Sequence, residues 1–301
     1  METIVIGVDH GWSSIKTPNF IFPSGVGEIT TEPAFRNNTL EYEGKWYQVG
    51  TGRQPVMPNK VSDERYYLLT LAAIAKELKQ RKKRKASVYL SAGLPLTRFG
   101  AEKEDFLTYL GKNKELTFRF EDEDYTINLV KVSVYPQCYA AVASKIDTME
   151  EDVLVVDIGS WTIDVMPIRD KFPIENQCLT LPRGIITCMN HINGECVRQF
   201  NTELSERTIE EFMRTGTANV GKQYLDLMKA ETRLFADTLW NILSENGYQI
   251  GTMPVIFVGG GATLIKNYGP KERNLTYIQD VRANAKGFEY LGKLWLLSHP
   301  M

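Results

Sequence analysis

Runs of apolar residues predict buried strands at the start and in the middle of the chain. Residues 4–8 and 153–156 are rich in β-branched and other apolar side chains, the pattern of a buried strand. Each run stops at an Asp-x-Gly sequence and apolar residues resume after it, as in the return strand of a hairpin. A further buried strand is expected at residues 253–258, where the sequence MPVIFV precedes three consecutive glycines.

Segments with helical spacing lie between and after these strands. We expect an amphipathic helix that begins near Asp63 and ends in the basic stretch 76–86 (KELKQRKKRKA), because cations suit the C-terminal end of a helix. The runs 185–197 and 221–243 predict two further helices. The acidic sequence EDEDY at 121–125 predicts a hairpin turn between two short strands.

The two hairpin sequences resemble each other. Residues 4–16 read IVIGVDHGWSSIK and residues 153–164 read VLVVDIGSWTID, so that both contain V-D-x-G, then a hydroxyl residue, then Ile. The copies lie about half a chain apart, which indicates a duplicated domain. The aligned pairs are Asp9 with Asp157, Ser14 with Thr162, and Lys16 with Asp164.

The two turns have the composition of a phosphate site. A tight turn with glycine and a small hydroxyl residue presents successive backbone N–H groups to an anion. Asp9 and Asp157 would act through Mg²⁺ and its waters, and Lys16 would pair with phosphate oxygens. One such turn alone would be interpreted as a β-turn, but two copies in matching strand contexts favour a shared polyphosphate. The residues assigned to phosphate are Gly11, Trp12, Ser13, Ser14, Lys16, Gly159, Ser160, Trp161 and Thr162.

A glycine-rich turn in the last third of the chain is a third candidate element. Gly259, Gly260, Gly261 and Ala262 connect the strand at 253–258 to a helix-like start. Backbone without side chains allows a flat ring or a phosphate to approach closely, although many α/β proteins use such a turn only for packing. No G-x-G-x-x-G or G-x-x-x-x-G-K-[ST] motif occurs, which disfavours Rossmann and P-loop sites.

Composition narrows the class of protein. At 301 residues, with 43% hydrophobic and 24% charged residues, the chain is long enough for two globular domains. A net charge of −2 gives no reason to expect nucleic-acid binding, and no apolar run is long enough for a transmembrane helix. Four cysteines without a CxxC pair and three histidines argue against a zinc site or disulfides. We therefore expect a cytoplasmic protein without a signal peptide.

The order of these motifs resembles the actin, Hsp70 and sugar-kinase superfamily. Residues 9–16 and 157–164 are similar to its two phosphate loops, and 258–263 to its adenosine motif. The resemblance implies an α/β actin-like ATPase fold: two duplicated ribonuclease-H-like domains flanking a nucleotide cleft, with small subdomain insertions. Segments 134–144 and 283–297 are similar to the two helices that connect the domains, and their small residues would let them cross closely.

The resemblance also implies domain boundaries. Domain I would comprise residues 1–152 and the returning helix at about 284–301, with a small β-rich insertion at about 17–62. Domain II would comprise residues 153–283, with a helical insertion at about 185–250.

Two further segments resemble the ParM/StbA plasmid-segregation actins within this superfamily. LEYEGKWYQVGTG at 40–52 is similar to their Y-x-G-x-x-Y-x-V-G signature, and SVYLSAGLPLTRFG at 87–100 contains their Gly-Leu-Pro. The resemblance implies a filament-forming ATPase that binds ATP or ADP with Mg²⁺, GTP being an alternative nucleotide. Its partners would be further copies of itself and a centromere-binding adaptor. Neither direct nucleic-acid binding nor a membrane is expected.

The same resemblance suggests roles for single residues. Gln137 would position the attacking water while Asp157 and Asp9 hold the Mg²⁺-bound waters, or else Gln137 would only cap a helix. Gly184, after Arg183, would face a phosphate or ribose.

Lys222 and Glu231 lie in the region that brackets adenine, although a surface salt bridge fits them equally well. Trp12 and Trp161 depart from the family's small residues and would either pack on the nucleotide or fill the cleft floor.

Two other functions remain open at this point. A small-molecule kinase of the same fold would need a carboxylate aimed at a substrate hydroxyl and a full substrate pocket. The short insertion at 17–62, with Tyr42, Trp46 and Tyr47, is more typical of an interaction surface. A nucleotide-sensing scaffold without turnover is the third hypothesis. The basic stretch 76–86 could also contact a neighbouring subunit or an acidic adaptor.

Overall fold

The computed structural model describes residues 3–55, 59–149 and 152–299. Residues 56–58, which belong to the expected insertion, lie outside the described residues. The chain divides into two compact units: unit 1 contains residues 1–147 and 282–301, and unit 2 contains residues 148–281. Each unit has its own sheet and its own hydrophobic core.

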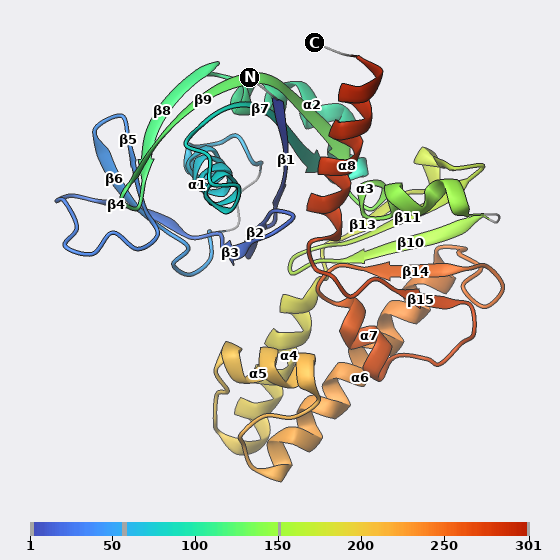
Figure 1. Ribbon diagram of the computed structural model, residues 1–301. Coiled ribbons are helices and arrows are strands. Elements are labelled where there is room, and N and C mark those ends of the chain that lie inside the picture. The colour runs from blue at the N-terminus through green and yellow to red at the C-terminus, as the bar shows by residue number, and fades with distance from the viewer. Residues whose placement is uncertain (1–2, 56–58, 150–151, 300–301) are drawn as a thin grey trace. The chain divides into compact units, whose positions relative to one another are not determined.

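Unit 1 is built on a strongly curved sheet that encloses one helix (Figure 1). Within the described residues its strand order is β3-β2-β1-β7-β9-β8-β5-β6-β4, in which β1, β7 and β9 are parallel. Val5, Ile6 and Val8 of β1 are buried, as their β-branched run predicts. The strands are β1 Thr3–His10, β2 Ser14–Lys16, β3 Ile21–Pro23, β4 Val26–Ile29, β5 Thr39–Tyr42, β6 Lys45–Val49, β7 Lys85–Leu94, β8 Glu115–Phe120 and β9 Glu123–Pro136.

The helices of unit 1 are α1 Arg65–Gln80, α2 Leu96–Leu110, α3 Tyr139–Val142 and α8 Ala283–Ser298. Strands β8 and β9 curve around α1 (Figure 1). Helix α1 is buried on most of its circumference, because its sequence YYLLTLAAIA leaves almost no polar face. The expected helix near Asp63 is thus present, beginning at Arg65.

Helix α8 packs on β1 and α3 with almost no side chain between the backbones. A Cβ atom added to Gly7 would lie 2.0 Å from the Ala285 carbonyl oxygen, and one added to Gly287 would lie 1.8 Å from the Ala140 carbonyl oxygen. Neither position has room for a methyl group. The small residues predicted to let two helices cross closely do so here, between α3 and α8.

Two expected helix boundaries are wrong. Residues 134–136 do not start a connecting helix but continue β9, because Tyr135 and Pro136 pair with the end of β7. The chain then turns at Cys138, whose φ is 61°, and α3 has only four residues before a 3₁₀ helix at Ala143–Thr148. The basic stretch 76–86 is likewise divided, since α1 ends at Gln80 and β7 begins at Lys85.

Unit 2 is a mixed sheet covered by helices. Its described strands are ordered β12-β11-β10-β14-β15, with β13 paired to β11. The strands are β10 Val153–Ile158, β11 Ile163–Arg169, β12 Phe172–Pro173, β13 Leu179–Leu181, β14 Val255–Val258 and β15 Leu275–Tyr277. The helices are the 3₁₀ helix Glu175–Gln177, α4 Ile185–Phe200, α5 Glu206–Thr215, α6 Lys222–Glu245 and α7 Ala262–Tyr268. Within the described ranges, no helix combines the length and the apolar character needed to cross a membrane.

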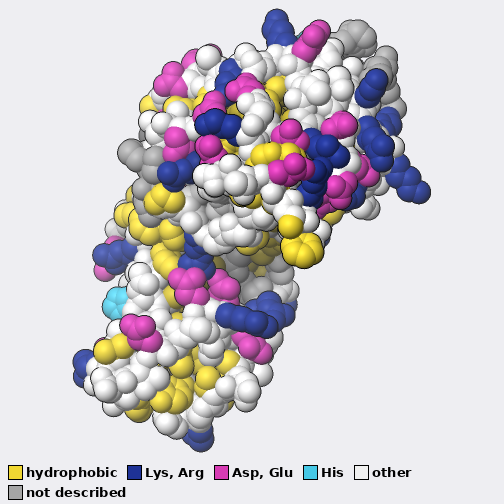
Figure 2. All heavy atoms as spheres, turned by 90° about the vertical axis from the view of Figure 1, so that its left-hand side faces the viewer, with side chains coloured by type: hydrophobic (Ala, Val, Ile, Leu, Met, Phe, Trp, Pro, Cys, Tyr) yellow, Lys and Arg dark blue, Asp and Glu magenta, His cyan; other side chains and the backbone are white. Residues whose placement is uncertain are grey.

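Basic and acidic side chains are interspersed on the surface. Figure 2 shows a face on which Lys and Arg side chains stand beside Asp and Glu side chains. In unit 1, Lys79 pairs with Glu121 at 2.6 Å and Arg84 pairs with Glu123 at 3.1 Å. The basic stretch and the acidic hairpin therefore neutralise each other in part within one chain, instead of presenting two fields of single sign.

A buried carboxylate ties the β2–β3 turn to α1. The side chain of Glu77 is fully buried and accepts hydrogen bonds from the backbone N–H of Asn19 at 3.0 Å and from its Nδ2 at 2.9 Å. Arg81 forms an ion pair with the same carboxylate. Burial would raise the pKa of Glu77, but hydrogen bonds from Thr17, Arg81 and Asn19 hold it below its usual value.

We expect Glu77→Gln to lower the free energy of unfolding by about 1–3 kcal/mol, because a buried charged acceptor is lost. A group with a lowered folded-state pKa stabilises the protein above its unfolded pKa and loses that effect as the pH falls through the folded one. The stabilities of wild type and variant should therefore converge on acidification. Chemical denaturation at several pH values measures this. Glu28→Gln, which removes an exposed partner of Lys45, is the control and should change stability by less than about 1 kcal/mol.

Candidate functional site

The two Asp-x-Gly turns form hairpins of identical register. In unit 1, β1 pairs with β2 so that Asp9 lies opposite Lys16. In unit 2, β10 pairs with β11 so that Asp157 lies opposite Asp164. The two pairs occupy equivalent positions in the sequence repeat, which aligns Asp9 with Asp157 and Lys16 with Asp164. The expected strand–turn–strand structure is present in both halves of the chain.

The first turn holds a buried carboxylate in a cationic environment. Asp9 accepts hydrogen bonds from Lys16 Nζ at 3.0 Å and from Gln137 Nε2 at 2.9 Å. Burial would raise the pKa of the Asp9 carboxyl, but the charges of Lys16 and Lys60 and these two hydrogen bonds hold it below its usual value. Asp9 is therefore an anion at neutral pH. The side chain of Gln137 points at Asp9, which is not the geometry of a helix cap.

The remainder of the first turn is packed against the insertion. The carbonyl oxygen of Trp12 accepts a hydrogen bond from the Ser24 hydroxyl, and that of Ser13 accepts one from the Ser24 N–H at 3.1 Å. The Trp12 ring lies under the guanidinium of Arg53, 5.6 Å from its centroid. A Cβ at Gly11 would lie 2.7 Å from the Ser14 carbonyl oxygen, so this position requires glycine.

The second turn is joined to the start of α4. The backbone N–H of Ile185 donates to the Gly159 carbonyl at 3.0 Å, and that of Ile186 donates to the Ser160 carbonyl at 3.0 Å. Gly184 donates to the Trp161 carbonyl at 2.9 Å, and a Cβ there would lie 2.5 Å from the Ser160 carbonyl oxygen. Gly184 is therefore required for packing the turn on the helix.

Asp164 occupies the position of Lys16 with the opposite charge. Its carboxylate accepts hydrogen bonds from the hydroxyls of Thr180 at 2.5 Å and Thr162 at 3.2 Å. The two turns are thus alike in backbone register and different in electrostatics. Cationic side chains gather at the first turn, whereas the second presents carboxylates and hydroxyls.

The glycine turn packs on Asp157. Gly259 has φ of 82°, and a Cβ there would lie 2.3 Å from Oδ1 of Asp157. A Cβ at Gly261 would lie 2.2 Å from Cγ2 of Ile158. Both glycines are explained by close packing of β14 and α7 on the end of β10. The atom nearest to a Cβ added at Gly260 is Ile185 Cδ1, at 3.7 Å. Of the three glycines, Gly260 is therefore the one with space for a ligand to approach.

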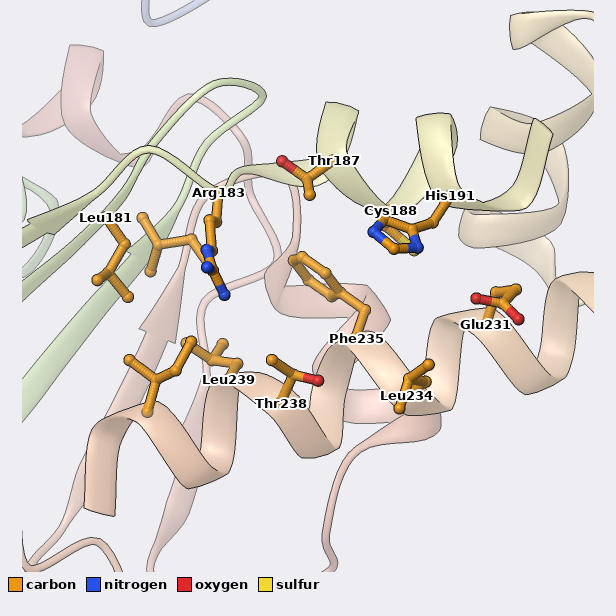
Figure 3. Close-up of a pocket in the computed structure, with 12 residues that line it drawn as sticks. Leu181, Arg183, Thr187, Cys188, His191, Glu231, Leu234, Phe235, Thr238 and Leu239 are labelled. Atoms are coloured by element: carbon orange, nitrogen blue, oxygen red, sulfur yellow. The ribbon is translucent and has the colours of Figure 1, made fainter. Parts of the chain in front are cut away.

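Unit 2 also contains a pocket of about 410 Å³ between α4 and α6. Figure 3 shows Arg183 and Glu231 toward opposite ends of it, with Phe235 between them. Its walls are mainly apolar side chains of α6, β11 and β13. Within the described part of the chain, none of the residues from Gly259 to Ala262 lines it. The pocket therefore unites two of the residues singled out in the sequence but does not include the glycine turn.

The structure separates Lys222 from the other candidates. It begins α6 and forms an exposed ion pair with Asp226, with 85% of its side chain accessible. Of the two interpretations of this residue, the geometry favours the surface salt bridge. Trp161 is 39% exposed, and Ala262 is the first, buried residue of α7.

Sequence reasoning missed Lys60 and His10. Lys60 Nζ donates to the Gly93 carbonyl at 3.3 Å, and burial lowers its pKa to about 8. His10 follows Asp9 directly; burial lowers its pKa to about 3, and Nε2 bonds to Thr70 Oγ1 at 2.7 Å. Lys60 lies in a stretch without helix or strand periodicity, so no pattern along the chain distinguishes it from a surface lysine.

No three His, Cys, Asp or Glu side chains of the described ranges converge to bind a metal directly.

Comparison with known proteins agrees with this geometry. Residues 7–139 match the family model for the N-terminal domain of actin-like proteins. The chain has the actin-like ATPase fold. An archaeal actin homologue in complex with ADP superposes with a TM-score of 0.79 at 19% identity, over 97% of this chain and 99% of that one. No curated protein sequence matches the chain significantly.

Two ParM structures are similar over nearly the whole chain. Bacillus thuringiensis ParM with ATP gives a TM-score of 0.73 at 15% identity, covering 99% of this chain and 100% of that one. A 15-stranded ParM filament from Clostridium botulinum gives 0.74 at 21% identity, covering 98% and 100%. The predicted fold class and the predicted resemblance to ParM-type actin-like proteins are confirmed. At these identities the likeness shows the fold and leaves function to be argued from the site.

Proposed function

We propose that this protein is an actin-like ATPase whose nucleotide state controls its assembly into filaments. The observation that carries the proposal is the matched register of the two hairpins, each with a buried aspartate before a glycine turn. Such turns present backbone N–H groups to phosphate oxygens. The proposed phosphate-binding residues are Gly11, Trp12, Ser13, Ser14, Lys16, Gly159, Ser160, Trp161 and Thr162.

ATP and ADP are the proposed ligands, with GTP as an alternative. Support comes from similar structures that contain ADP in an archaeal actin homologue and ATP in a ParM. The open side of Gly260 is the proposed contact of the adenosine, beside Gly259, Gly261 and Ala262. Arg183 and Gly184 are proposed to lie near the ribose or phosphates. Lys222 is kept only as a peripheral contact, because its ammonium already pairs with Asp226.

Mg²⁺ fits the donor set of these turns. Asp9 and Asp157 are buried carboxylates, and hard oxygen donors are what Mg²⁺ prefers, with waters completing its shell. We propose that both hold the metal through its waters; when bound, Mg²⁺ would neutralise phosphate charge.

Gln137 is the proposed positioning residue for the attacking water. Its Nε2 donates to Asp9, which leaves Oε1 directed elsewhere as an acceptor for a water proton. A glutamine is too weak a base to remove that proton, so its contribution is orientation. Hydrolysis would consequently be slow, which suits a filament whose turnover follows assembly.

Filament formation, a bacterial cytoplasmic location and a role in plasmid segregation through a centromere-binding adaptor complete the proposal. The similarity to a ParM filament supports self-assembly. We assign unit 1 to actin-like domain I and unit 2 to domain II; the contact boundaries at 147/148 and 281/282 lie within a few residues of those expected from the sequence.

Light scattering and pelleting of the purified protein test the proposal. With Mg-ATP the protein should sediment as filaments visible by electron microscopy, whereas with Mg-ADP it should stay in the supernatant. Phosphate release measured in the same samples should follow assembly. A protein that remains monomeric at high concentration with every nucleotide would contradict the cytomotive function, and phosphate transfer to a sugar in a coupled assay would indicate a kinase.

A further inference from the structure

Lys60 is a cation at the first phosphate turn with no role in the functions described so far. It lies near the end of the expected β-rich insertion, five residues before α1, and its ammonium donates to the carbonyl of Gly93 at the end of β7 at 3.3 Å. The Phe106 ring lies on another side, with its centroid 5.6 Å from Nζ. Asp9 is within its electrostatic reach. Three separate segments of unit 1 thus hold Lys60 beside the turn.

Lys60 shares the electrostatic environment of Asp9 with a second lysine. Asp9 carries one negative charge and faces two lysines, Lys16 at 3.0 Å and Lys60. The next cation, Arg98, is already paired with Glu102. Among the described residues, Lys60 itself has no carboxylate within ion-pair distance. A half-buried charge without such a partner is costly unless a ligand of opposite sign compensates it.

The ammonium of Lys60 has N–H groups that are available to a ligand. An ammonium has three N–H groups, and among the described residues Gly93 is the one hydrogen-bond acceptor that the structure gives it. A neutral carbonyl and a ring face anchor such a side chain without neutralising it. Lys16 contacts Asp9 directly from the opposite strand of the hairpin, whereas Lys60 acts on it through its charge.

We propose that Lys60 binds the terminal phosphate of the triphosphate and so makes the site prefer ATP to ADP. The proposal rests on the proposed nucleotide function and adds a specificity residue to it. Lys16, inside the turn, would contact phosphates that both nucleotides share. Lys60 reaches the turn from outside and would meet the additional phosphate, which carries the charge that distinguishes ATP from ADP.

A purely structural role predicts a different result. If Lys60 served only to fasten the segment before α1 to β7, its removal would lower the stability of the protein. It would also weaken the binding of ATP and of ADP to a similar extent. If it binds the terminal phosphate, its removal weakens the binding of ATP and leaves the binding of ADP nearly unchanged. The ratio of the two dissociation constants therefore distinguishes the roles.

The experiment measures Mg-ATP and Mg-ADP dissociation constants by equilibrium titration for wild type, Lys60→Gln and Lys60→Arg, using a non-hydrolysable ATP analogue as well. Lys60→Gln should raise the dissociation constant of Mg-ATP about tenfold or more, since a charged hydrogen bond is lost. It should raise the dissociation constant of Mg-ADP less than about twofold. Lys60→Arg should recover part of the preference. Lys103→Gln is the matched control, because Lys103 is also half-buried over a phenylalanine ring, 5.5 Å from the centroid of Phe99.

Each outcome decides between the alternatives. A Lys60→Gln protein that keeps the wild-type ATP-to-ADP ratio overturns the role of Lys60 while leaving the nucleotide function intact. A wild-type protein that binds neither nucleotide overturns the proposed function and this inference together. Equal weakening of both nucleotides, with a lowered midpoint of thermal unfolding, assigns Lys60 to the structural role and overturns the inference.

Discussion

Replacing Asp157 with asparagine should lower the rate of phosphate release from Mg-ATP about 100-fold while leaving the fold intact. Groups that hold a metal through its waters typically contribute 10- to 100-fold to activity. Asparagine keeps the shape of the side chain, which matters because Gly259 packs against its oxygen. The amide removes the negative charge that the proposed Mg²⁺ requires.

The measurement is single-turnover phosphate release, with circular dichroism to confirm the fold. Asp152→Asn is the matched control, since Asp152 lies in the same unit and forms an exposed pair with Arg169 at 2.9 Å. The control should release phosphate at the wild-type rate. Wild-type release by Asp157→Asn would contradict the assignment, and a wild-type protein without release would indicate a nucleotide-sensing scaffold.

The second large effect is expected on stability. Gly287→Val should destabilise unit 1 by about 3 kcal/mol or more, because its Cβ would meet the Ala140 carbonyl oxygen and the helix must move away from α3. Unfolding in denaturant, followed by the fluorescence of the tryptophans, measures the change.

A glycine with space around it provides the control. Gly194 lies in α4, and a Cβ there would meet nothing within 4 Å. Gly194→Ala should stabilise the protein by about 0.5–1 kcal/mol, since alanine loses less backbone entropy in a helix. Similar stabilities of Gly287→Val and wild type would show that α8 can move without cost.

The local elements at the site follow from the sequence. The hairpins at Asp9 and Asp157 and the strand–glycine–helix turn at Gly259 occur where the patterns place them. These features depend on neighbouring residues: a β-branched run, a turn sequence, a return strand. Their alignment as a repeat predicted two similar hairpins, and the structure gives both the same register.

Long-range pairing decided what the sequence did not predict. Residues 134–136 were expected in a helix because segment 134–144 resembles the first connecting helix of the superfamily. In the fold β9 extends through Pro136, because β7 offers a parallel partner over ten residues. Lys60 was missed for the same reason. Its neighbours along the chain show no helix or strand periodicity, and its significance comes from Gly93 and Asp9, which lie far away in sequence.

The path of the chain has a consequence for biosynthesis. Unit 1 is interrupted after residue 147 and resumes at residue 282, so a ribosome makes all of unit 2 before α8. Until then Gly7 and Gly93, whose close contacts are with α8, have no covering helix. Unit 2 is continuous and can fold as soon as it emerges, whereas the nascent unit 1 keeps an apolar surface uncovered and is the part most exposed to aggregation and chaperone binding during synthesis.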